Sequence, residues 1–404
     1  MAWDVAAVRR IEYERTIVTD SLTQTIAAIH AAPTRIVLVI TGGGSGALSK
    51  LLEVPGASRT VVAGLVPYAN AALIEFLGHE PEKFCDESTA LTMAVTAYQR
   101  AVALVAAEDN DDLETPADLL GIAATASLVS DRPKRGDHRA LVAIQSSTAT
   151  QLARLDLEKD ARDRPGEEGL VASLIIDRLA DVAGIEMRPA LPLGDLDRLT
   201  TRQTTAATAV ADVWNGRRSI TWSLPDGRWA DTPPASPAGI LSGSFAPRHE
   251  GHVGLLQVAE HILAGPVYYE LPVVNADKPP LDYDSIECRR RVFTDKPLAI
   301  TASATFEEKA AVFPGTMFVV GADTAERVID PAFYDGAAKG RDAAMASIRD
   351  HGCGFLVAGR QQHERFQDLT SLSVPASFTD LFTAIPSDRF RCDISSTEIR
   401  NDSA

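Results

Sequence analysis

Two histidines separated by two residues carry the strongest chemical signal in the chain. His249 and His252 belong to the segment SGSFAPRHEGH over Ser242–His252, where a loop becomes a helix. Both side chains therefore lie on one helix face near its N-terminus, where free backbone N–H groups and the helix dipole favour phosphate. The alternatives are a metal pair or two helix-capping histidines. Zinc would need further ligands, and no partner cysteine or HExxH spacing is nearby.

A second polar cluster stands near the end of the chain, where Ile394–Arg400 has the sequence ISSTEIR. Hydroxyl groups at a helix start cap backbone amides or donate to phosphate oxygens. Thr397 and Ser396 precede Arg400 by three and four residues, so the three side chains reach the same region of space. A helix N-cap with a surface arginine explains this segment taken alone. Together with the histidine pair, it predicts a phosphate-binding site.

Two strand–loop–helix patterns supply the scaffold for such residues. The β-branched run Arg35–Ile40 precedes the glycine-rich Thr41–Gly46 and a helix through Leu52, and Gly239–Leu241 precedes the histidine segment and a helix to about Leu263. Strands that alternate with helices indicate an α/β fold with two α/β domains and mostly parallel sheets. Further strands are predicted near 60–66, 121–126 and 140–144, a helix over about 88–107, and helical periodicity over 149–183. The predicted domains are 1–160 and 238–404, joined by a helical and proline-rich region over 161–237.

Composition limits the function classes. The 404 residues include 39 Lys and Arg against 55 Asp and Glu, a net charge of −16, which argues against a nucleic-acid partner. The four cysteines lie far apart and fit neither a disulfide framework nor a zinc site. No apolar run reaches the ~18 residues of a membrane span, and the first residues lack a signal-peptide core. We therefore expect no membrane partner and a cytoplasmic location.

The H-x-G-H motif after a strand, with I-S-S-T-x-I-R near the chain end, resembles the nucleotidylyltransferase superfamily, above all the nicotinate/nicotinamide mononucleotide adenylyltransferases. Two further segments agree. Phe318–Asp323 (FVVGAD) is similar to that family's G-x-D strand end, and Phe355–Arg360 (FLVAGR) to its later strand that closes in Gly-Arg. The resemblance covers about 238–400 and implies a Rossmann-like parallel-sheet nucleotidylyltransferase fold.

The resemblance implies transfer of AMP from ATP to a nicotinamide- or nicotinate-type mononucleotide, with release of pyrophosphate. The implied partners are ATP and a small phosphorylated substrate, in a homo-oligomer, and Mg²⁺ enters with ATP rather than in a protein metal site. His249, His252 and Arg400 are the implied catalytic residues. The implied nucleotide-binding residues are Gly243, Ser244, Phe245, Gly251, Gly321, Asp323, Ser395, Ser396 and Thr397. Lys278 and Arg289 are the implied substrate contacts.

The segment departs from the family pattern at two positions. Ala246 precedes Pro247 where relatives usually have an Asp-Pro or Asn-Pro pair, and Glu250 stands between the histidines. Two other functions therefore stay open. One is cytidylyl or adenylyl transfer to another phosphorylated acceptor, and the other is a nucleotide-binding sensor or scaffold.

The N-terminal glycine loop is neither a Walker A motif nor a dehydrogenase fingerprint, because Ala47 and Leu48 replace the lysine and the glycine that these need. VPGAS over Val54–Ser58 and GLVPYAN over Gly64–Asn70 instead resemble the C-terminal domain of the CinA proteins, a nicotinamide mononucleotide amidohydrolase family.

That resemblance puts Thr41 at the position of the serine nucleophile and Leu73 at that of the lysine, while Tyr68 and Asn70 are kept. A hydroxyl nucleophile needs a base or a lowered pKa to react. We therefore expect a degenerate domain that binds a mononucleotide through Thr41, Tyr68 and Asn70 with weak or no hydrolysis. A purely structural domain is the alternative.

Overall fold

The computed structural model describes residues 21–108, 118–132, 136–274, 279–334, 336, 338–362 and 365–391. The chain divides into two compact units. Unit 1 comprises Met1–Thr205 with Asp277–Asp284, and unit 2 comprises Ala206–Ala276 with Ser285–Ala404. Each unit has its own large sheet with helices packed on it, which confirms the prediction of two α/β domains.

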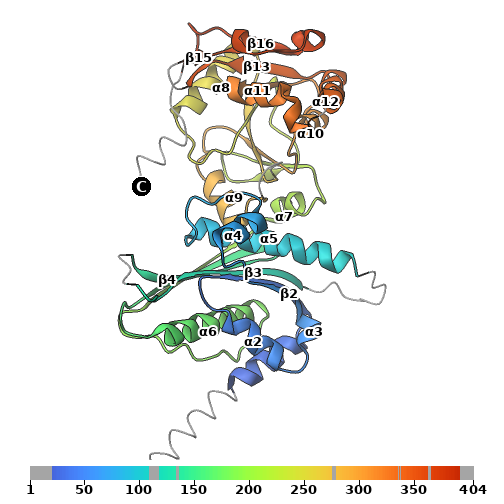
Figure 1. The fold of residues 1–404 in the computed structure, drawn as a ribbon. Coiled ribbons are helices and arrows are strands. Elements are labelled where there is room, and N and C mark those ends of the chain that lie inside the picture. The colour runs from blue at the N-terminus through green and yellow to red at the C-terminus, as the bar shows by residue number, and fades with distance from the viewer. Residues whose placement is uncertain are drawn as a thin grey trace, which may run out of the picture. The chain divides into compact units, whose positions relative to one another are not determined.

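Unit 1 is built on a six-stranded sheet in the order β2-β1-β3-β4-β5-β6 (Figure 1). Its strands are β1 (Thr34–Thr41), β2 (Val61–Leu65), β3 (Asp118–Ser127), β4 (His138–Gln145), β5 (Ala149–Leu157) and β6 (Arg198–Thr205). β1 pairs in parallel with β2 and β3, and the strands from β3 to β6 pair antiparallel. β1 is buried at nearly every residue, as its unbroken apolar run requires.

Helices cover both faces of this sheet. The helix over 21–31, α2 (Gly46–Glu53) and α6 (Arg164–Val182) pack on one face, and the short α3 (Ala57–Thr60) follows α2. α4 (Asn70–Leu77) and α5 (Glu87–Ala106) pack on the other face (Figure 1). α5 approaches β3 so closely that a Cβ atom at Gly121 would lie 2.1 Å from the Ala94 carbonyl oxygen.

The prediction of helical structure over all of 149–183 is wrong, because its first part is β5. Leu152 and Leu155 have a spacing that also suits a helix, but the segment pairs along its whole length with both β4 and β6. α6 begins only after Asp163, whose side chain accepts from the Gly166 N–H at 2.9 Å. The long first stretch of unit 1 ends at Thr205, because β6 completes its sheet, whereas the domain boundaries predicted from the sequence were 160 and 237.

Unit 2 contains an eight-stranded sheet in the order β16-β13-β12-β9-β10-β11-β7-β8. Six strands are parallel: β9 (Gly239–Ser242), β10 (Val267–Pro272), β11 (Leu298–Thr301), β12 (Met317–Gly321), β13 (Gly354–Ala358) and β16 (Phe382–Ile385). β7 (Ile220–Ser223) and β8 (Trp229–Ala230) add an antiparallel hairpin to this sheet, so the proline-rich stretch over 224–237 lies within unit 2. β14 (Arg360–Gln362) and β15 (Arg365–Gln367) form a separate hairpin.

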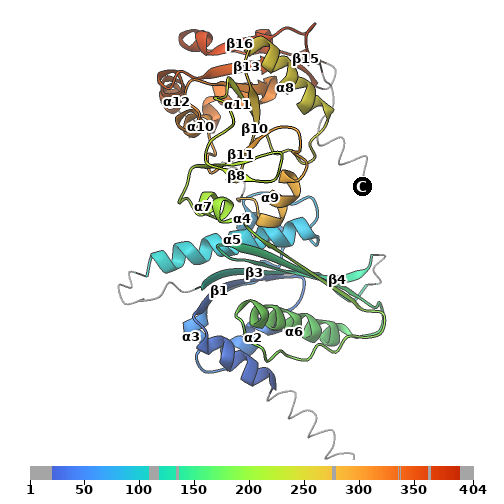
Figure 2. The same cartoon turned by 180° about the vertical axis from the view of Figure 1, so that it is seen from behind.

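This strand order is that of a doubly wound, Rossmann-like sheet. The chain runs outward from β9 through β10 and β11, then returns to place β12 on the other side of β9. α8 (Glu250–Leu263) packs against β9 and β10, whereas α10 (Phe306–Val312), α11 (Ala322–Ile329) and α12 (Ala338–Asp350) share a core on the other face (Figure 2). The carboxyl ends of β9 and β12 therefore flank the switch point, where such sheets bind ligands.

The shorter helices of unit 2 are α7 (Thr208–Trp214), α9 (Tyr283–Arg290, whose first two residues belong to unit 1), η1 (Pro331–Phe333), η2 (Leu369–Ser371) and η3 (Ala376–Leu381). Over the described residues, the helices are too short or too polar to cross a bilayer. The three cysteines in the described part, Cys85, Cys288 and Cys353, form no disulfide with one another.

Candidate functional site

The predicted histidine pair lies at the switch point of unit 2. β9 ends at Ser242, beside the end of β12, and the loop that follows leads into α8. His249 is the N-cap residue of α8, and its ring centroid lies 3.8 Å from that of His252. The sequence therefore placed both imidazoles correctly at a helix N-terminus.

Hydrogen bonds fix which nitrogen of each ring carries the proton. The backbone N–H of His249 donates to His252 Nδ1 at 3.2 Å, and the backbone N–H of Gly251 donates to His249 Nδ1 at 3.2 Å. A neutral imidazole that accepts at Nδ1 carries its proton on Nε2. The capping interpretation is thus correct for both histidines, and it leaves two Nε2–H donors with no hydrogen-bond partner among the described residues.

Both rings are neutral at pH 7. Burial, and to a smaller extent the charges of His249 and Arg248, lower the pKa of His252 to about 4. Burial also lowers the pKa of His249. Neutral Nε2–H groups in a partly desolvated site are suited to donate to phosphate oxygens.

The Phe245 ring packs against His252. The side chain is buried and meets the His252 ring edge-on at 5.1 Å, and its backbone has a positive φ of 46°. A Cβ atom at Gly243 would lie 3.0 Å from the Phe245 ring, so a larger residue there would press on this ring. Phe245, predicted as a nucleotide contact, therefore lies where it orients His252 rather than on the exposed surface.

Arg248 is held away from the histidine rings. Its guanidinium donates to Asp295 at 2.6 and 2.8 Å and to the Tyr269 hydroxyl at 3.2 Å, and it lies over the rings of Tyr269 and Phe293 at 4.7 and 4.9 Å. No sequence motif indicated this cluster, because the partners of Arg248 lie 21 to 47 residues further along the chain. Its effect on the site is electrostatic, since the Arg248 charge helps to keep His252 neutral.

Three other predicted residues also lie around the switch point. A Cβ atom at Gly321 would lie 2.7 Å from Asp323 Oδ1, so the glycine at the end of β12 lets this carboxylate fold back. Arg360, which follows β13, lies 3.5 Å from Asp323 Oδ2. Arg289 of α9 donates to the Ser244 carbonyl at 3.1 Å, which places a predicted substrate contact on the predicted nucleotide loop.

The remaining predicted residues of this site, Lys278, Ser395, Ser396, Thr397 and Arg400, lie outside the described residues. Within the described residues, no group of three or more His, Cys, Asp or Glu side chains has the arrangement of a metal site.

A buried polar network lies beneath the histidine loop and was missed from the sequence. Lys309 Nζ of α10 donates to the two Glu270 carboxylate oxygens at 2.7 and 3.0 Å and to Ser242 Oγ at 2.8 Å. The Thr301 hydroxyl also donates to Glu270. Lys309 is 3% exposed and Glu270 0%. The network joins the ends of β9 and β11 to β10 and α10, directly before Gly243.

Unit 1 has a cavity of about 390 Å³ at the end of β1. Its lining residues are Ile40, Gly42, Gly43, Ser45, Val66, Tyr68, Arg164, Pro165 and Glu168. Of the residues predicted here, Tyr68 lines the cavity and is 65% exposed, whereas Asn70 is the exposed first residue of α4. Thr41 is 8% exposed. No side chain among the described residues is hydrogen-bonded to its hydroxyl, so no base is in place to activate it.

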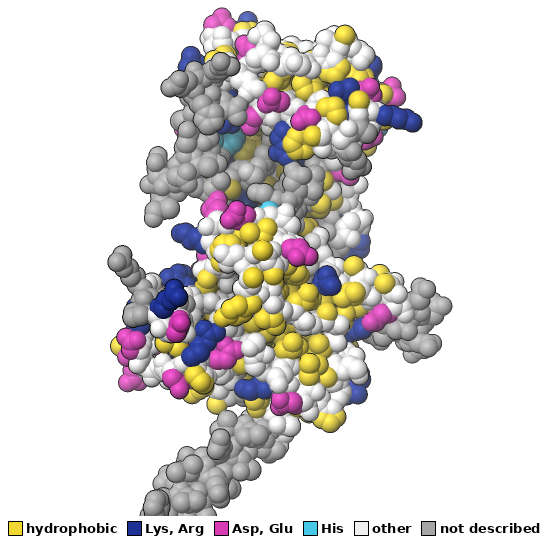
Figure 3. Space-filling view, in the orientation of Figure 1, with side chains coloured by type: hydrophobic (Ala, Val, Ile, Leu, Met, Phe, Trp, Pro, Cys, Tyr) yellow, Lys and Arg dark blue, Asp and Glu magenta, His cyan; other side chains and the backbone are white. Residues whose placement is uncertain are grey.

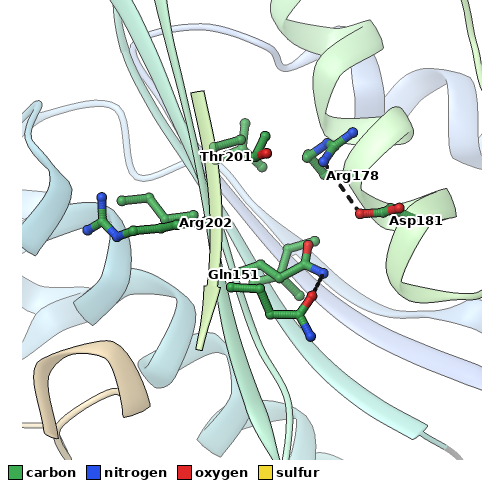
Figure 4. A pocket seen from close by; sticks show the side chains of 10 residues that line it. Gln151, Arg178, Asp181, Thr201 and Arg202 are labelled. Atoms are coloured by element: carbon green, nitrogen blue, oxygen red, sulfur yellow. Dashed lines mark hydrogen bonds and ion pairs between the residues drawn. The ribbon is translucent and has the colours of Figure 1, made fainter. Parts of the chain in front are cut away.

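A second pocket of unit 1 lies between β5, β6 and α6 (Figure 4). Gln151 and Thr201 face Arg178 and Asp181 of α6, and Arg202 points to the other side of the sheet. The volume is about 110 Å³. Ligand pockets usually measure about 300–1,000 Å³, so this one is too small for a nucleotide.

The low pKa of His252 predicts an acid-dependent loss of stability in unit 2. The folded state binds this proton only near pH 4, whereas the unfolded state binds it near the ordinary 6.5. Stability should therefore be unaffected above pH 6.5 and fall by roughly 3 kcal/mol as the pH decreases to 4.

Urea unfolding followed by tryptophan fluorescence measures this effect, because the described tryptophans Trp214, Trp222 and Trp229 all belong to unit 2. His252→Asn, which retains an acceptor for the His249 N–H, should show a shallower pH dependence than the wild type. Equal slopes for the two proteins would contradict the assigned pKa.

No protein-family model and no curated protein matches the chain. Similar solved structures include a competence-damaged protein (CinA) superfamily protein from Klebsiella pneumoniae, with 15% identity, a TM-score of 0.30, and coverage of 41% of this chain and 98% of that chain. A competence/damage inducible protein from Agrobacterium tumefaciens has 16% identity and a TM-score of 0.29, with coverage of 42% of this chain and 94% of that chain. A CinA superfamily protein from Escherichia coli has 18% identity and a TM-score of 0.28, with coverage of 42% of this chain and 88% of that chain.

Proposed function

We propose that unit 2 is a nucleotidyltransferase that transfers AMP from ATP to a nicotinamide- or nicotinate-type mononucleotide. The observation that carries the proposal is the pair of neutral imidazoles at the start of α8, with their Nε2–H donors beside the switch point of a doubly wound sheet. This combination suits a triphosphate, because helix amides and N–H donors converge where such sheets bind nucleotides.

The proposed reaction is a single displacement at phosphorus. A phosphate oxygen of the acceptor forms a bond to the α-phosphorus of ATP, and the bond from that phosphorus to the bridging oxygen of pyrophosphate breaks. Negative charge is redistributed over the α-phosphoryl and leaving oxygens in the transition state. His249 and His252 would donate to these oxygens, and no covalent enzyme intermediate is needed.

Magnesium would come with the triphosphate. A magnesium ion usually keeps several of its waters and binds the phosphates of the nucleotide. The ion would neutralise the phosphate oxygens. We also assign Arg400, with Ser395, Ser396 and Thr397, to the β- and γ-phosphates.

For unit 1 we propose an amidohydrolase-like domain that has lost efficient hydrolysis. Thr41 is nearly buried and has no adjacent base among the described residues. Leu73 of α4, at the position expected for a lysine, is 2% exposed and its side chain packs in the core between α4 and the sheet. Leu73 cannot take the proton that the Thr41 hydroxyl must lose to become a nucleophile.

A pyrophosphate-release assay tests the function of unit 2. The full chain is incubated with Mg²⁺, each of four nucleoside triphosphates, and either nicotinamide mononucleotide or its nicotinate counterpart. Pyrophosphate and dinucleotide are expected in equal amounts with ATP. Release only with CTP or another phosphorylated acceptor would favour the competing transferase. Absence of release with every pair would favour a sensor or scaffold.

A further inference from the structure

Arg248 acts on the histidine pair by its position as well as by its charge. Its peptide bond to His249 carries the backbone N–H that donates to His252 Nδ1 at 3.2 Å. This hydrogen bond is the one that keeps the proton of His252 on Nε2, the nitrogen that would donate to a phosphate. A group that fixes the Arg248 side chain therefore also limits how far this peptide bond can move.

The Arg248 side chain is held in one place. Charged side chains of both signs lie on the surface of unit 2 (Figure 3), but that of Arg248 is only 11% exposed and lies over the Tyr269 and Phe293 rings at 4.7 and 4.9 Å. Its guanidinium donates to both carboxylate oxygens of Asp295 at 2.6 and 2.8 Å, and to the Val292 carbonyl at 3.0 Å. A bidentate ion pair of this kind has a single preferred geometry.

Two further contacts join this ion pair to His252. The Tyr269 hydroxyl accepts from Arg248 at 3.2 Å and donates to the backbone carbonyl of His252 at 3.5 Å. Phe293 is buried and meets the Phe245 ring edge-on at 5.2 Å, and Phe245 in turn packs against His252. The segment between α9 and β11 thus holds the histidine loop through the ion pair and through ring packing.

The same contacts argue against Arg248 as a direct ligand of the triphosphate. Its two terminal nitrogens already donate to Asp295, Val292 and Tyr269. A phosphate could bind them only after the ion pair opened, which would leave the Asp295 carboxylate beside the incoming anion. The guanidinium is therefore placed to hold the loop rather than the substrate.

We propose that Asp295 and Arg248 are positioning residues that keep the proton of His252 on Nε2 and so orient the donor for nucleotidyl transfer. Asp295 fixes the Arg248 side chain, and Arg248 fixes the peptide N–H that binds His252 Nδ1. Neither positioning residue touches the substrate. The use of the donor in catalysis rests on the proposed function of unit 2, whereas the position of the proton does not.

The position of the proton is measured by 15N NMR of the histidine rings in the full chain, because protonated and bare ring nitrogens have clearly different chemical shifts. At neutral pH the wild type should carry the His252 proton on Nε2. Asp295→Asn replaces a carboxylate oxygen by an N–H donor that opposes the guanidinium, so the ion pair opens. The share of His252 with its proton on Nδ1 should then rise by about fivefold, as expected for the loss of about one hydrogen bond.

Two further variants test the route. Arg248→Met removes the charge, keeps an apolar side chain over the rings, and should move the proton in the same direction. Asp380→Asn is the matched control, because Asp380 binds Arg349 with both oxygens at 2.6 and 3.0 Å and Arg349 lies over the Phe378 ring. This pair lies just before β13 and β16 begin, at the edge of the sheet opposite the histidines, so the His252 proton should not move.

Pyrophosphate release measures whether the transferase uses this orientation. Asp295→Asn should lower kcat by about tenfold or more with little change in KM for ATP, because a misplaced donor is lost mainly in the transition state. A clearly lower KM for ATP would instead identify Arg248 as a phosphate ligand released from its ion pair, and would overturn the proposal.

The proposal also fails if the His252 proton stays on Nε2 in both variants of the ion pair, if Asp380→Asn moves it equally, or if it moves while kcat is unchanged. The Asp295 side chain is 49% exposed, so its replacement should leave the fold intact. A wild type that releases no pyrophosphate with any substrate pair would refute the transferase. The NMR comparison would still decide whether the ion pair positions the proton.

Discussion

Alanine in place of His252 is expected to lower kcat for nucleotidyl transfer by about 10²–10³-fold, with a much smaller change in KM for ATP. Loss of one preorganised donor to a developing oxyanion has an effect of this size. The proton of His252 is held on Nε2 because Nδ1 accepts from the His249 N–H, so the donor is oriented before substrate binds. Steady-state pyrophosphate release at saturating ATP measures the change.

Two controls separate this role from that of a helix cap. His261→Ala removes an exposed histidine from the last turn of the same helix and should leave kcat unchanged. His252→Asn keeps an acceptor for the His249 N–H but has too short a side chain to replace the Nε2 donor, so it should fold normally and remain slow. A decrease of less than ~10-fold in His252→Ala would refute the assignment.

The elements that carry the histidines were predictable because their signals are local. A β-branched or apolar run, a glycine loop and an amphipathic stretch follow one another closely in the chain at both Thr34–Glu53 and Gly239–Leu263. Ala149–Leu157 was misassigned because Leu152 and Leu155 have helical spacing, whereas in the structure they lie on opposite faces of β5, both of which are buried. Only the pairing of this segment with β4 and β6 decides between helix and strand, and such pairing is not local.

In the candidate sites, too, local spacing was predictable and long-range contacts were not. His249 and His252 are three residues apart on one helix, so their spacing alone brings them together. Glu168 meets Ser45 across 123 residues, and Lys309 meets Glu270 across 39. These carboxylates resemble ordinary surface charges in the sequence. Their partners come from different strands and helices, which only the tertiary fold brings together.

Methionine in place of Lys309 is expected to destabilise unit 2 by about 3–5 kcal/mol. The substitution leaves Glu270 as a fully buried carboxylate with the Thr301 hydroxyl as its remaining partner, and breaking one side of a buried ion pair has a cost of this order. The urea midpoint of unit 2, followed by its tryptophans, measures the loss. A cost below about 1 kcal/mol would show that water or a neighbouring group replaces the lysine.

The double variant Lys309→Met/Glu270→Leu tests whether this network only stabilises the fold or also positions the histidine loop. Removal of both charges abolishes the unpaired ion, so the double variant should be more stable than Lys309→Met alone, with strong coupling between the two sites. Ser242 would still lack the Lys309 donor that holds the strand end before Gly243. If the network also positions the histidine loop, stability should recover in the double variant while pyrophosphate release stays low. Recovery of both would show that the ion pair serves folding alone.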